Sequence, residues 1–334
     1  MSHRSLIVLP DDSSKPILDA IAGAEKSLRV KMFVFSDAAL IRAVIDAHQR
    51  GVKTQVMLNP ARRSGEAENQ ATRKQLEHAG VEVKDSNPAF DLTHEKSMVV
   101  DGETAMIMSL NWDPKNFTET RDYAVVTSHR HEVDEVAAGF DADWHRKKFD
   151  PGAKAHLIWC NFNGRNRVAQ FIDAAKDTLF LQNERYQDEV IIERLVRATH
   201  RGVKLHVLAR PAHTLKKGKL IEGVEGLRIL HDVGAKVHKL KGLKLHAKLM
   251  AADGKRCIVG SINLAPGSFD SRRELAIEVD DEKVMKPLHH VVSHDWEHSR
   301  PLDLSDAGLL ADLEEEGAEA AEILALDAGK AKKK

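Results

Sequence analysis

The sequence predicts an α/β protein built as a tandem duplication of one α/β/α sandwich unit. The length of 334 residues suits two domains of roughly 150 residues each. An internal repeat links the two halves. Within each half, β-branched and apolar runs alternate with amphipathic helical stretches, which is typical of sheets covered by helices.

The internal repeat is the clearest of these observations. The tetrad Arg50-Gly51-Val52-Lys53 recurs as Arg201-Gly202-Val203-Lys204, each time between a helical pattern and an apolar strand. From residue 94 to residue 144 the offset is constant at 152 residues (246 minus 94) and needs no gap. The pairs matched at this offset are His94 and His246, Lys96 and Lys248, Asp101 and Asp253, Ser109 and Ser261, Asn111 and Asn263, Arg121 and Arg273, Asp122 and Glu274, Asp143 and Asp295, and Trp144 and Trp296. Agreement at so many chemically specific positions excludes chance.

The elements of the first half follow from its periodicity. Strands are expected at Leu6–Leu9, Leu28–Phe35, Lys53–Leu58, Met98–Val100, Ala105–Met108 and Tyr123–Val126. Helices are expected at Ile17–Lys26, Ala38–Gln49, Glu66–Ala79 and Val133–Lys147. The second half repeats this order from Ala155 onward.

Three segments are predicted from these patterns: a first unit at 1–150, a second at 151–300 and a helical tail at 301–334. Asp150-Pro151-Gly152 marks the linker between the units. In the tail, apolar residues at helical spacing surround the acidic block Glu314–Glu316, and a basic end follows. We expect an amphipathic helix packed on the body, with a dimer contact or a peripheral membrane contact as open alternatives.

Composition narrows the class of protein. Hydrophobic residues make up 42% and charged residues 30%, which is the balance of a globular protein, and the formal net charge is −1. The chain as a whole is therefore no polycation, and attraction to phosphate must come from local patches. No apolar run approaches the roughly 20 residues that span a bilayer. We expect a cytoplasmic protein, and the sequence leaves its oligomeric state open.

Two short motifs carry the chemistry. The first is His94-Glu95-Lys96, four residues and then Asp101, and the second is His246-Ala247-Lys248, four residues and then Asp253. On a strand, residues two apart point to the same face, so each His and Lys project into one space. A Ser-x-Asn pair follows each motif with the same spacing, Ser109 with Asn111 and Ser261 with Asn263. Two such sets place two imidazoles around a shared anion site.

These groups suffice to break a phosphodiester. One imidazole must be neutral and attack phosphorus, while the other must be protonated and give its proton to the leaving alkoxide. Lys96 and Lys248, with the two serines and two asparagines, would bind the phosphate oxygens. Asp122 and Glu274 would orient the catalytic imidazoles through their far nitrogens. The sequence has no cluster with zinc spacing and no Gly-rich phosphate loop, so we expect neither metal nor cofactor.

The doubled pattern H-x-K-x4-D-x6-G-S-x-N, with an acid eleven residues after the Asn, resembles the phospholipase D superfamily from Leu6 to Trp296. The segments Thr120–Tyr123 and Phe140–Trp144 resemble its bacterial branch of cardiolipin-synthase-like and phospholipase-D-like proteins. The first motif departs where Met108 replaces the family's Gly, a change expected to narrow the pocket, and where Asp122 replaces Glu.

The resemblance implies two α/β/α units with mixed sheets that meet to form one active site. It also implies catalysis through a phosphohistidine, with His94 as the nucleophile and His246 as the acid. By the same resemblance, Asp101 and Asp253 are structural and lie outside the pocket.

Three functions remain open from the sequence. The first is a metal-independent phosphodiesterase or phosphatidyltransferase acting on phospholipids, and the second is a nuclease with the same site. The third, a non-catalytic binding protein, is disfavoured because no member of either motif is lost. The neutral charge and 5% aromatic content weigh against a nucleic-acid channel. Basic residues follow two of the expected strands and form either a rim that gathers an anionic substrate or solvated basic loops: Arg62, Arg63, Arg210, His213, Lys216, Lys217 and Lys219.

Overall fold

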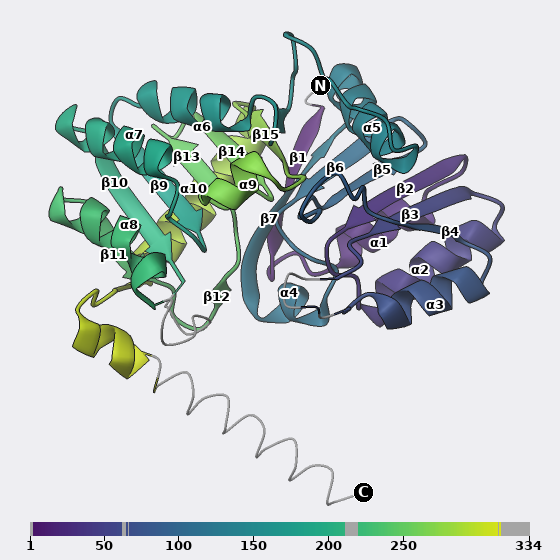
Figure 1. The fold of residues 1–334 in the computed structure, drawn as a ribbon, viewed down its shortest axis with the longest axis horizontal. Coiled ribbons are helices and arrows are strands. Elements are labelled where there is room, and N and C mark those ends of the chain that lie inside the picture. The colour runs from purple at the N-terminus through teal and green to yellow at the C-terminus, as the bar shows by residue number, and fades with distance from the viewer. Residues whose placement is uncertain (1–2, 62–64, 66, 211–219, 313, 315–334) are drawn as a thin grey trace, which may run out of the picture.

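The computed structural model describes residues 3–61, 65, 67–210, 220–312 and 314. Within these residues the chain folds into two eight-stranded mixed sheets that lie side by side, with helices on their outer flanks (Figure 1). The expected α/β class and the duplication of one unit are confirmed.

Seven strands of the first half form the first sheet in the order β1-β7-β6-β5-β2-β3-β4, and the eighth strand, β12 (Lys244–Leu245) of the second half, pairs with β7. Strands β2, β3 and β4 are parallel to one another, and β5, β6, β7 and β1 continue the sheet in antiparallel fashion. The elements are β1 (Arg4–Leu9), α1 (Lys15–Ala22), β2 (Ser27–Met32), α2 (Ala38–Gln49), β3 (Lys53–Leu58), α3 (Gln70–His78), β4 (Glu82–Asp85), β5 (Ser97–Val100), β6 (Thr104–Met108), α4 (Pro114–Thr118), β7 (Thr120–Thr127) and α5 (Arg130–Trp144).

The second sheet repeats this plan with the order β16-β11-β10-β9-β13-β14-β15-β8. Its parallel strands β9, β10 and β11 correspond to β2, β3 and β4. The elements are β8 (Ile158–Trp159), α6 (Gly164–Asp173), β9 (Thr178–Asn183), α7 (Glu189–His200), β10 (Lys204–Ala209), α8 (Leu220–Asp232), β11 (Lys236–Lys239), β12 (Lys244–Leu245), β13 (Leu249–Ala252), β14 (Arg256–Gly260), α9 (Pro266–Asp270), β15 (Leu275–Val279), α10 (Glu282–Glu297) and β16 (Arg300–Pro301).

The repeated tetrad has the same structural role in both halves. Helices α2 and α7 each begin after an aspartate whose side chain accepts a backbone N–H, Asp37 from Leu40 and Asp188 from Ile191. Both helices end just before a glycine with positive φ, 93° at Gly51 and 91° at Gly202. The glycine turns the chain back, so the next strand pairs with the sheet that the helix covers.

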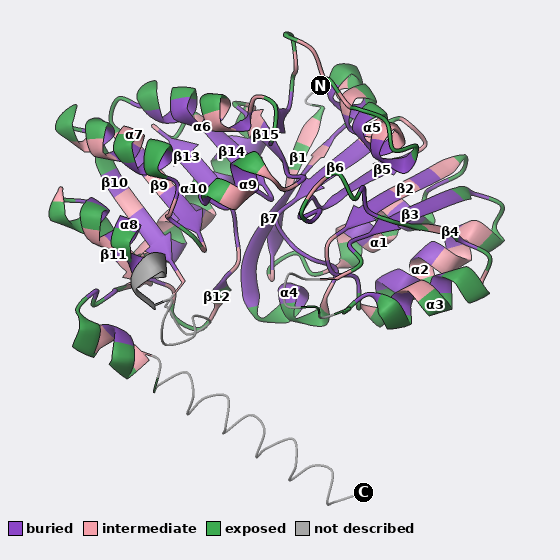
Figure 2. Cartoon of the chain, in the orientation of Figure 1, coloured by how far each residue is buried: buried purple, intermediate pink, exposed green. Residues whose placement is uncertain are grey.

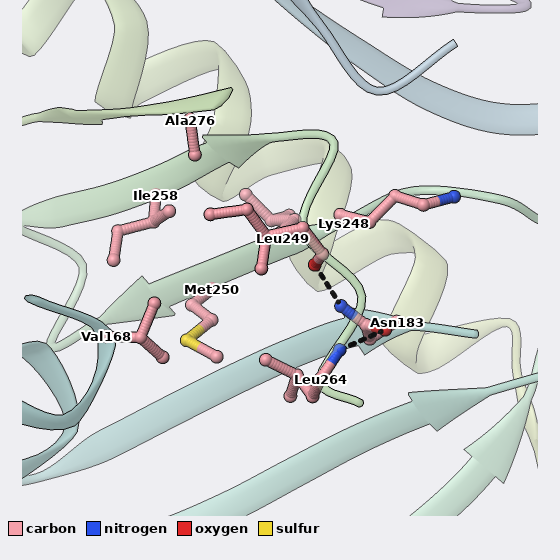
Figure 3. Close-up of a pocket in the computed structure, with 9 residues that line it drawn as sticks. Val168, Asn183, Lys248, Leu249, Met250, Ile258, Leu264 and Ala276 are labelled. Carbon is pink, nitrogen blue, oxygen red and sulfur yellow. Dashed lines mark hydrogen bonds between the residues drawn. The ribbon is translucent and has the colours of Figure 1, made fainter. Parts of the chain in front are cut away.

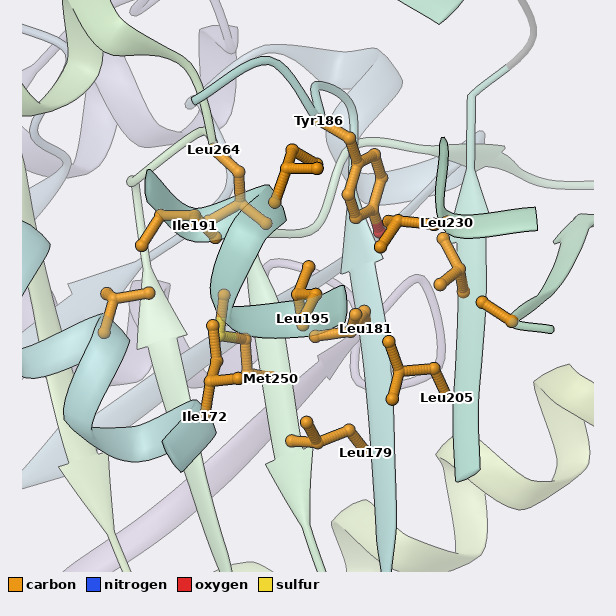
Figure 4. Packing of buried hydrophobic residues seen from close by; sticks show 14 of the residues in the cluster. Ile172, Leu179, Leu181, Tyr186, Ile191, Leu195, Leu205, Leu230, Met250 and Leu264 are labelled. Atoms are coloured by element: carbon orange, nitrogen blue, oxygen red, sulfur yellow. The ribbon is translucent and has the colours of Figure 1, made fainter. Parts of the chain in front are cut away.

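The strands are mostly buried (Figure 2), and the three largest hydrophobic clusters form one layer in each unit and one layer between the units. Helices α1–α3 cover the outer face of the first sheet, and α6–α8 cover the outer face of the second, where Leu181, Ile191 and Leu195 pack together (Figure 4). The third layer joins residues of both halves, among them Val125 and Val259 on the two sheets. The two sheets therefore share a core, and the polar site described below lies beside it.

The structure differs from the expected elements mainly at strand and helix ends. The strand expected at Leu28–Phe35 ends at Met32, and the helix expected at Ile17–Lys26 ends at Ala22. Strand β4 was not predicted because it is a mostly exposed edge strand with no apolar alternation. In the tail, Leu309 is buried and Leu310 is exposed, and the remaining apolar residues of the predicted tail helix lie outside the described residues.

Candidate active site

The two halves exchange backbone contacts where the His motifs lie. Strand β12, just before His246, pairs with β7 of the first half, with Leu245 opposite Arg121. The counterpart is a parallel bridge between Thr93 and Arg273. Each His motif thus runs alongside the segment of the other half that carries the acid, Asp122 within β7 and Glu274 directly before β15, and one site forms at the interface.

Each imidazole is held by a carboxylate from the opposite half. His94 Nδ1 lies 2.9 Å from Glu274 Oε2, and His246 Nδ1 lies 2.9 Å from Asp122 Oδ1. The side chains of both histidines are only 10% and 13% exposed. Because Nδ1 is engaged in both rings, Nε2 is the nitrogen presented for chemistry. The pairing of both acids with the histidines agrees with the sequence analysis, and the exchange between halves is new.

The two lysines lie in the same space as the histidines. Lys96 Nζ donates to the carbonyl oxygen of His94, and Lys248 Nζ donates to that of His246. Burial, followed by the charge of Lys248, lowers the pKa of Lys96 well below its usual range, and the charges of both lysines lower the pKa of His94. Burial is the main reason that the pKa of His94 lies well below its usual range, with Lys96 and then Lys248 adding to it. His94 is therefore held neutral, as a nucleophile requires.

The supporting carboxylates differ between the two pairs. Burial pushes the pKa of Asp122 upward, but the charge and hydrogen bond of His246, with Lys248 and Ser109, outweigh it and lower the pKa overall. Burial raises the pKa of Glu274 to about 7, against the lowering effect of Lys96. Asp122 therefore stays ionised at neutral pH, whereas Glu274 is close to half protonated.

The predicted phosphate ligands occupy two kinds of position. Ser109 Oγ donates to Asp122 Oδ1 at 2.6 Å and accepts from Tyr123 N, and Ser261 Oγ lies between the backbone N–H and carbonyl of Leu275. Both hydroxyls are engaged within the protein, so the structure places the serines as supports of the site. Asn111 and Asn263 are buried, and their amide oxygens have no hydrogen-bond partner within the described residues. An amide oxygen only accepts hydrogen bonds, so these two atoms would be completed by a donor and not by a phosphate oxygen.

Buried ion pairs fix the interface around these groups. Arg121 forms two hydrogen bonds with Asp295, and Arg273 bonds Asp143 at 2.9 Å, so both pairs join one half to the other. Asp143 also accepts from Lys31 at 2.7 Å. Removing one member of a buried pair leaves an uncompensated charge, so these pairs fix the relative placement of the halves.

The motif aspartates lie away from the interface. Asp101 accepts backbone N–H groups of Glu25, Lys26 and Ser27, and Asp253 does the same for residues 176–178. Both have positive φ, 55° and 56°. Each tightens the turn that precedes the parallel strand beside its motif, as the structural role predicts.

Met108 does not narrow the site as the sequence suggested. Its side chain is fully buried in the hydrophobic layer between the first sheet and α1–α3. At the matching Gly260, a Cβ would collide with the carbonyl of Leu275 and with Ala276. The Met108–Gly260 difference between the halves therefore reflects the space available in each core and not the width of the site.

Glu184 was missed by the sequence analysis. It follows β9 directly, and its carboxylate lies 2.6 Å from Lys248 Nζ, 3.0 Å from Arg210 Nη1 and 3.9 Å from His246 Nε2. Arg210 therefore neighbours the site, as the predicted rim requires. Arg62, Arg63, His213, Lys216, Lys217 and Lys219 lie outside the described residues. No repeat signal marks Glu184, because the first half has Phe33 at the corresponding place after β2.

A small cavity lies behind Lys248, between β13, β14 and the loop that ends in Leu264 (Figure 3). Its volume is about 10 Å³, which is room for about one water. The Lys248 side chain extends away from it, and Asn183 bridges Ile262 and Leu264 at its edge (Figure 3). The cavity is too small for a substrate, so the chemistry belongs to the interface.

The interface therefore brings together the neutral imidazole of His94, the imidazole of His246 hydrogen-bonded to an ionised carboxylate, and the amino groups of the two lysines. Such a set can attack a phosphorus atom and protonate the group that leaves. Within the described ranges, no three His, Cys, Asp or Glu side chains are arranged to hold a metal ion.

Comparison with known proteins agrees with this fold. The family model described as cardiolipin synthase, PLD-like domain, matches residues 17–144 and again residues 168–296. The chain therefore belongs to the phospholipase D-like family. The two matches coincide with the two halves, so the family's unit occurs twice.

Curated relatives match parts of their own length. A mitochondrial cardiolipin hydrolase of Xenopus laevis is 28% identical over 147 residues, which is 42% of this chain and 64% of that protein. A polyphosphate kinase 1 of Chlorobaculum tepidum is 23% identical over 303 residues, 84% of this chain and 42% of that protein. The chain thus spans less than two thirds of either relative.

Among solved structures, phosphatidylserine synthase of Haemophilus influenzae matches with a TM-score of 0.71 and 10% identity, over 96% of this chain and 94% of that one. At this identity the match concerns the fold, and it covers both units together. No helix in the described part of the chain is both long and apolar enough to cross a membrane.

Proposed function

We propose that the protein is a metal-independent phosphodiesterase or phosphatidyltransferase that acts on phospholipids through a phosphohistidine. The observation that carries the proposal is the pair of imidazoles, each held at Nδ1 by a carboxylate of the other half and both close to Lys96 and Lys248. The two ammonium groups would balance the charge on phosphorus that other enzymes balance with a cation.

The reaction would proceed in two steps. Nε2 of His94 attacks phosphorus, the bond from phosphorus to the leaving oxygen breaks, and that oxygen takes a proton from His246. Water or an alcohol then gives a proton to His246 and attacks phosphorus, which breaks the bond to His94 and restores both residues. The geometry supports His94 as the nucleophile because its pKa is lowered and its Nδ1–H faces both Glu274 and the carbonyl of Ser261.

Phospholipids are favoured as substrates on two grounds. The family description and the name of the Xenopus relative both concern cardiolipin. Beside Lys248, Glu184 also reduces the positive charge of the site. A single phosphodiester carries one negative charge, whereas nucleic acid and polyphosphate present several adjacent ones and bind best to basic tracks. A nuclease with the same site is the second candidate.

A side-by-side substrate panel in EDTA tests the proposal. Vesicles of phosphatidylglycerol or phosphatidylcholine and bis(p-nitrophenyl) phosphate should be turned over, with His94→Ala as the inactive control. Oligonucleotide binding should be weak and lost at modest salt. Activity that disappears in EDTA and returns with Mg²⁺ would contradict the mechanism. Oligonucleotide cleavage without turnover of any lipid would favour the nuclease.

A further inference from the structure

One place in the site breaks the approximate symmetry of the two halves. The residue that directly follows β2 is Phe33, and the residue that directly follows β9 is Glu184. The Phe33 ring lies against His94, with centroids 4.8 Å apart, and 5.0 Å below Lys96 Nζ. Glu184 takes the corresponding place beside His246 and Lys248. One histidine thus has an apolar ring as its neighbour, and the other has a carboxylate.

We propose that Glu184 is a positioning residue that makes His246, and not His94, the proton donor. The inference rests on the proposed function and deepens it, because it explains how two similar motifs divide opposite roles. The carboxylate lies 3.9 Å from His246 Nε2, the nitrogen that must carry the donated proton.

The distance suits this role. At 3.9 Å a carboxylate attracts the imidazolium by charge but does not hold its proton in a hydrogen bond, so the proton stays available to the leaving oxygen. Together with Asp122 on Nδ1, it places a negative charge near both nitrogens of the same ring. An imidazolium between two carboxylates is favoured over the neutral ring.

Glu184 also balances the positive charge of Lys248, which would otherwise repel a protonated His246. Lys248 Nζ is bound to Glu184 at 2.6 Å, so its positive charge is balanced close to its source. Burial pushes the pKa of Glu184 upward, but Lys248, His246 and Arg210 outweigh it and hold the pKa well below its usual range. Glu184 is therefore ionised at neutral pH.

The first half has the opposite environment. Phe33 supplies no negative charge, and Lys96 is the second-largest cause, after burial, of the lowered pKa of His94. His94 thus lies beside an apolar ring at the position where His246 lies beside a second carboxylate. The charged and titratable groups that face His246 and Glu184 are Asp122 on β7, Lys248 before β13, Arg210 after β10, and His94 and Lys96 across the interface.

The dependence of turnover on the leaving group distinguishes an effect of Glu184 on proton donation from its other effects on the site. Phosphodiesters with alkyl alcohols as leaving groups need protonation, whereas those with p-nitrophenol hardly do. Glu184→Gln keeps the volume of the side chain and removes its charge. We expect turnover of alkyl diesters to fall about 10- to 100-fold and turnover of bis(p-nitrophenyl) phosphate to fall less than about threefold. The pH above which alkyl-diester activity declines should shift downward.

Two further variants keep the test decisive. Glu184→Asp retains the charge and should restore most of the alkyl-diester activity. Arg210→Met removes another partner of Glu184 and should keep the wild-type ratio between the two substrates, whatever its effect on KM. An equal loss for both substrates in Glu184→Gln, with an unchanged pH profile, would overturn the proposal and leave Glu184 a structural residue.

The proposed function itself is judged by the wild type. If the wild type hydrolyses neither substrate, the proposed function is wrong. If the wild type hydrolyses them and Glu184→Gln loses activity equally on both, only the role of Glu184 is refuted.

If circular dichroism shows that Glu184→Gln does not fold, Phe33→Glu gives a second measurement. A carboxylate beside His94 should hold that ring protonated and slow p-nitrophenolate release by about tenfold or more. An unchanged release rate in folded Phe33→Glu would count against the proposal that a neighbouring carboxylate decides which histidine is the proton donor.

Discussion

The His94–Glu274 pair and the His246–Asp122 pair occupy matching places, yet their surroundings differ in opposite directions. Asp122 accepts hydrogen bonds from Ser109, Asn116 and Thr120 at 2.6 to 2.9 Å, in addition to its contact with His246. Glu274 has one buried oxygen without a partner within the described residues, and burial raises its pKa to about 7. His246 is therefore paired with a carboxylate that stays ionised, whereas His94 is paired with a carboxyl group that is readily protonated.

This difference shows how a duplicated unit can supply two different functions. The motif residues themselves are nearly identical, so they cannot tell the two histidines apart. The distinction comes from the residues around them: Phe33 against Glu184, and Asn116 and Thr120 against Ser268 and Arg272 at the same offset. Under the proposed function, these neighbours make one histidine the nucleophile and the other the proton donor.

Replacing the two histidines should give the largest contrast. His94→Ala removes the attacking nitrogen, so hydrolysis of every diester should fall about 10⁴-fold or more. His246→Asn keeps the nucleophile, so a burst of p-nitrophenolate from bis(p-nitrophenyl) phosphate should remain, because that leaving group needs little protonation. Stopped-flow absorbance measures both. A burst that survives in His94→Ala and is lost in His246→Asn would reverse the assignment.

Neutralising the two acids should give the next largest contrast. Among the described residues, Asp122 is the one carboxylate bonded to His246 Nδ1, so turnover of Asp122→Asn should fall about 10³-fold. Glu274→Gln should cost about tenfold or less, because the Ser261 carbonyl at 3.1 Å still accepts the Nδ1–H of His94 and Glu274 is half neutral near pH 7. Steady-state rates at pH 7 provide the measurement, and equal losses would show that the two pairs are equivalent.

The buried ion pairs of the interface should differ in their effect on stability. Arg121→Met leaves Asp295 buried without its two hydrogen bonds and should lower the free energy of unfolding by about 3–5 kcal/mol. Arg273→Met should cost only about 1–2 kcal/mol, because Lys31 still bonds Asp143. Urea unfolding followed by tryptophan fluorescence tests both variants. A larger loss for Arg273→Met would refute the compensating role of Lys31.

The pH dependence of kcat/KM should report the environment of His94 and gives the smallest effect. A base with a lowered pKa stays neutral to lower pH, so activity should persist well below pH 6.5, the ordinary pKa of histidine. Removing Lys96 should move this acidic limb to higher pH more than removing Lys248, because the charge of Lys96 contributes more. The pH profiles of kcat/KM for Lys96→Met and Lys248→Met test this order. A larger shift of the acidic limb in Lys248→Met would contradict it.

The sequence was sufficient to predict the duplication, the two motifs, their lysines and the two acids, because all of these recur at one offset. It did not predict which acid serves which histidine, since spacing along the chain carries no information on the exchange between halves. Glu184 was not found because its counterpart is Phe33 and the repeat shows no match there. The short helix α4, which carries Asn116, has only five residues and leaves no periodic pattern.

The residue that carries the covalent phosphoryl group tests the central claim most directly. Wild-type protein should be quenched within the first turnover on bis(p-nitrophenyl) phosphate, digested at neutral or alkaline pH and examined by mass spectrometry. The account predicts a p-nitrophenyl phosphoryl adduct on the peptide that contains His94 and none on the peptide that contains His246. An adduct on His246, or turnover with no adduct on either histidine, would contradict it.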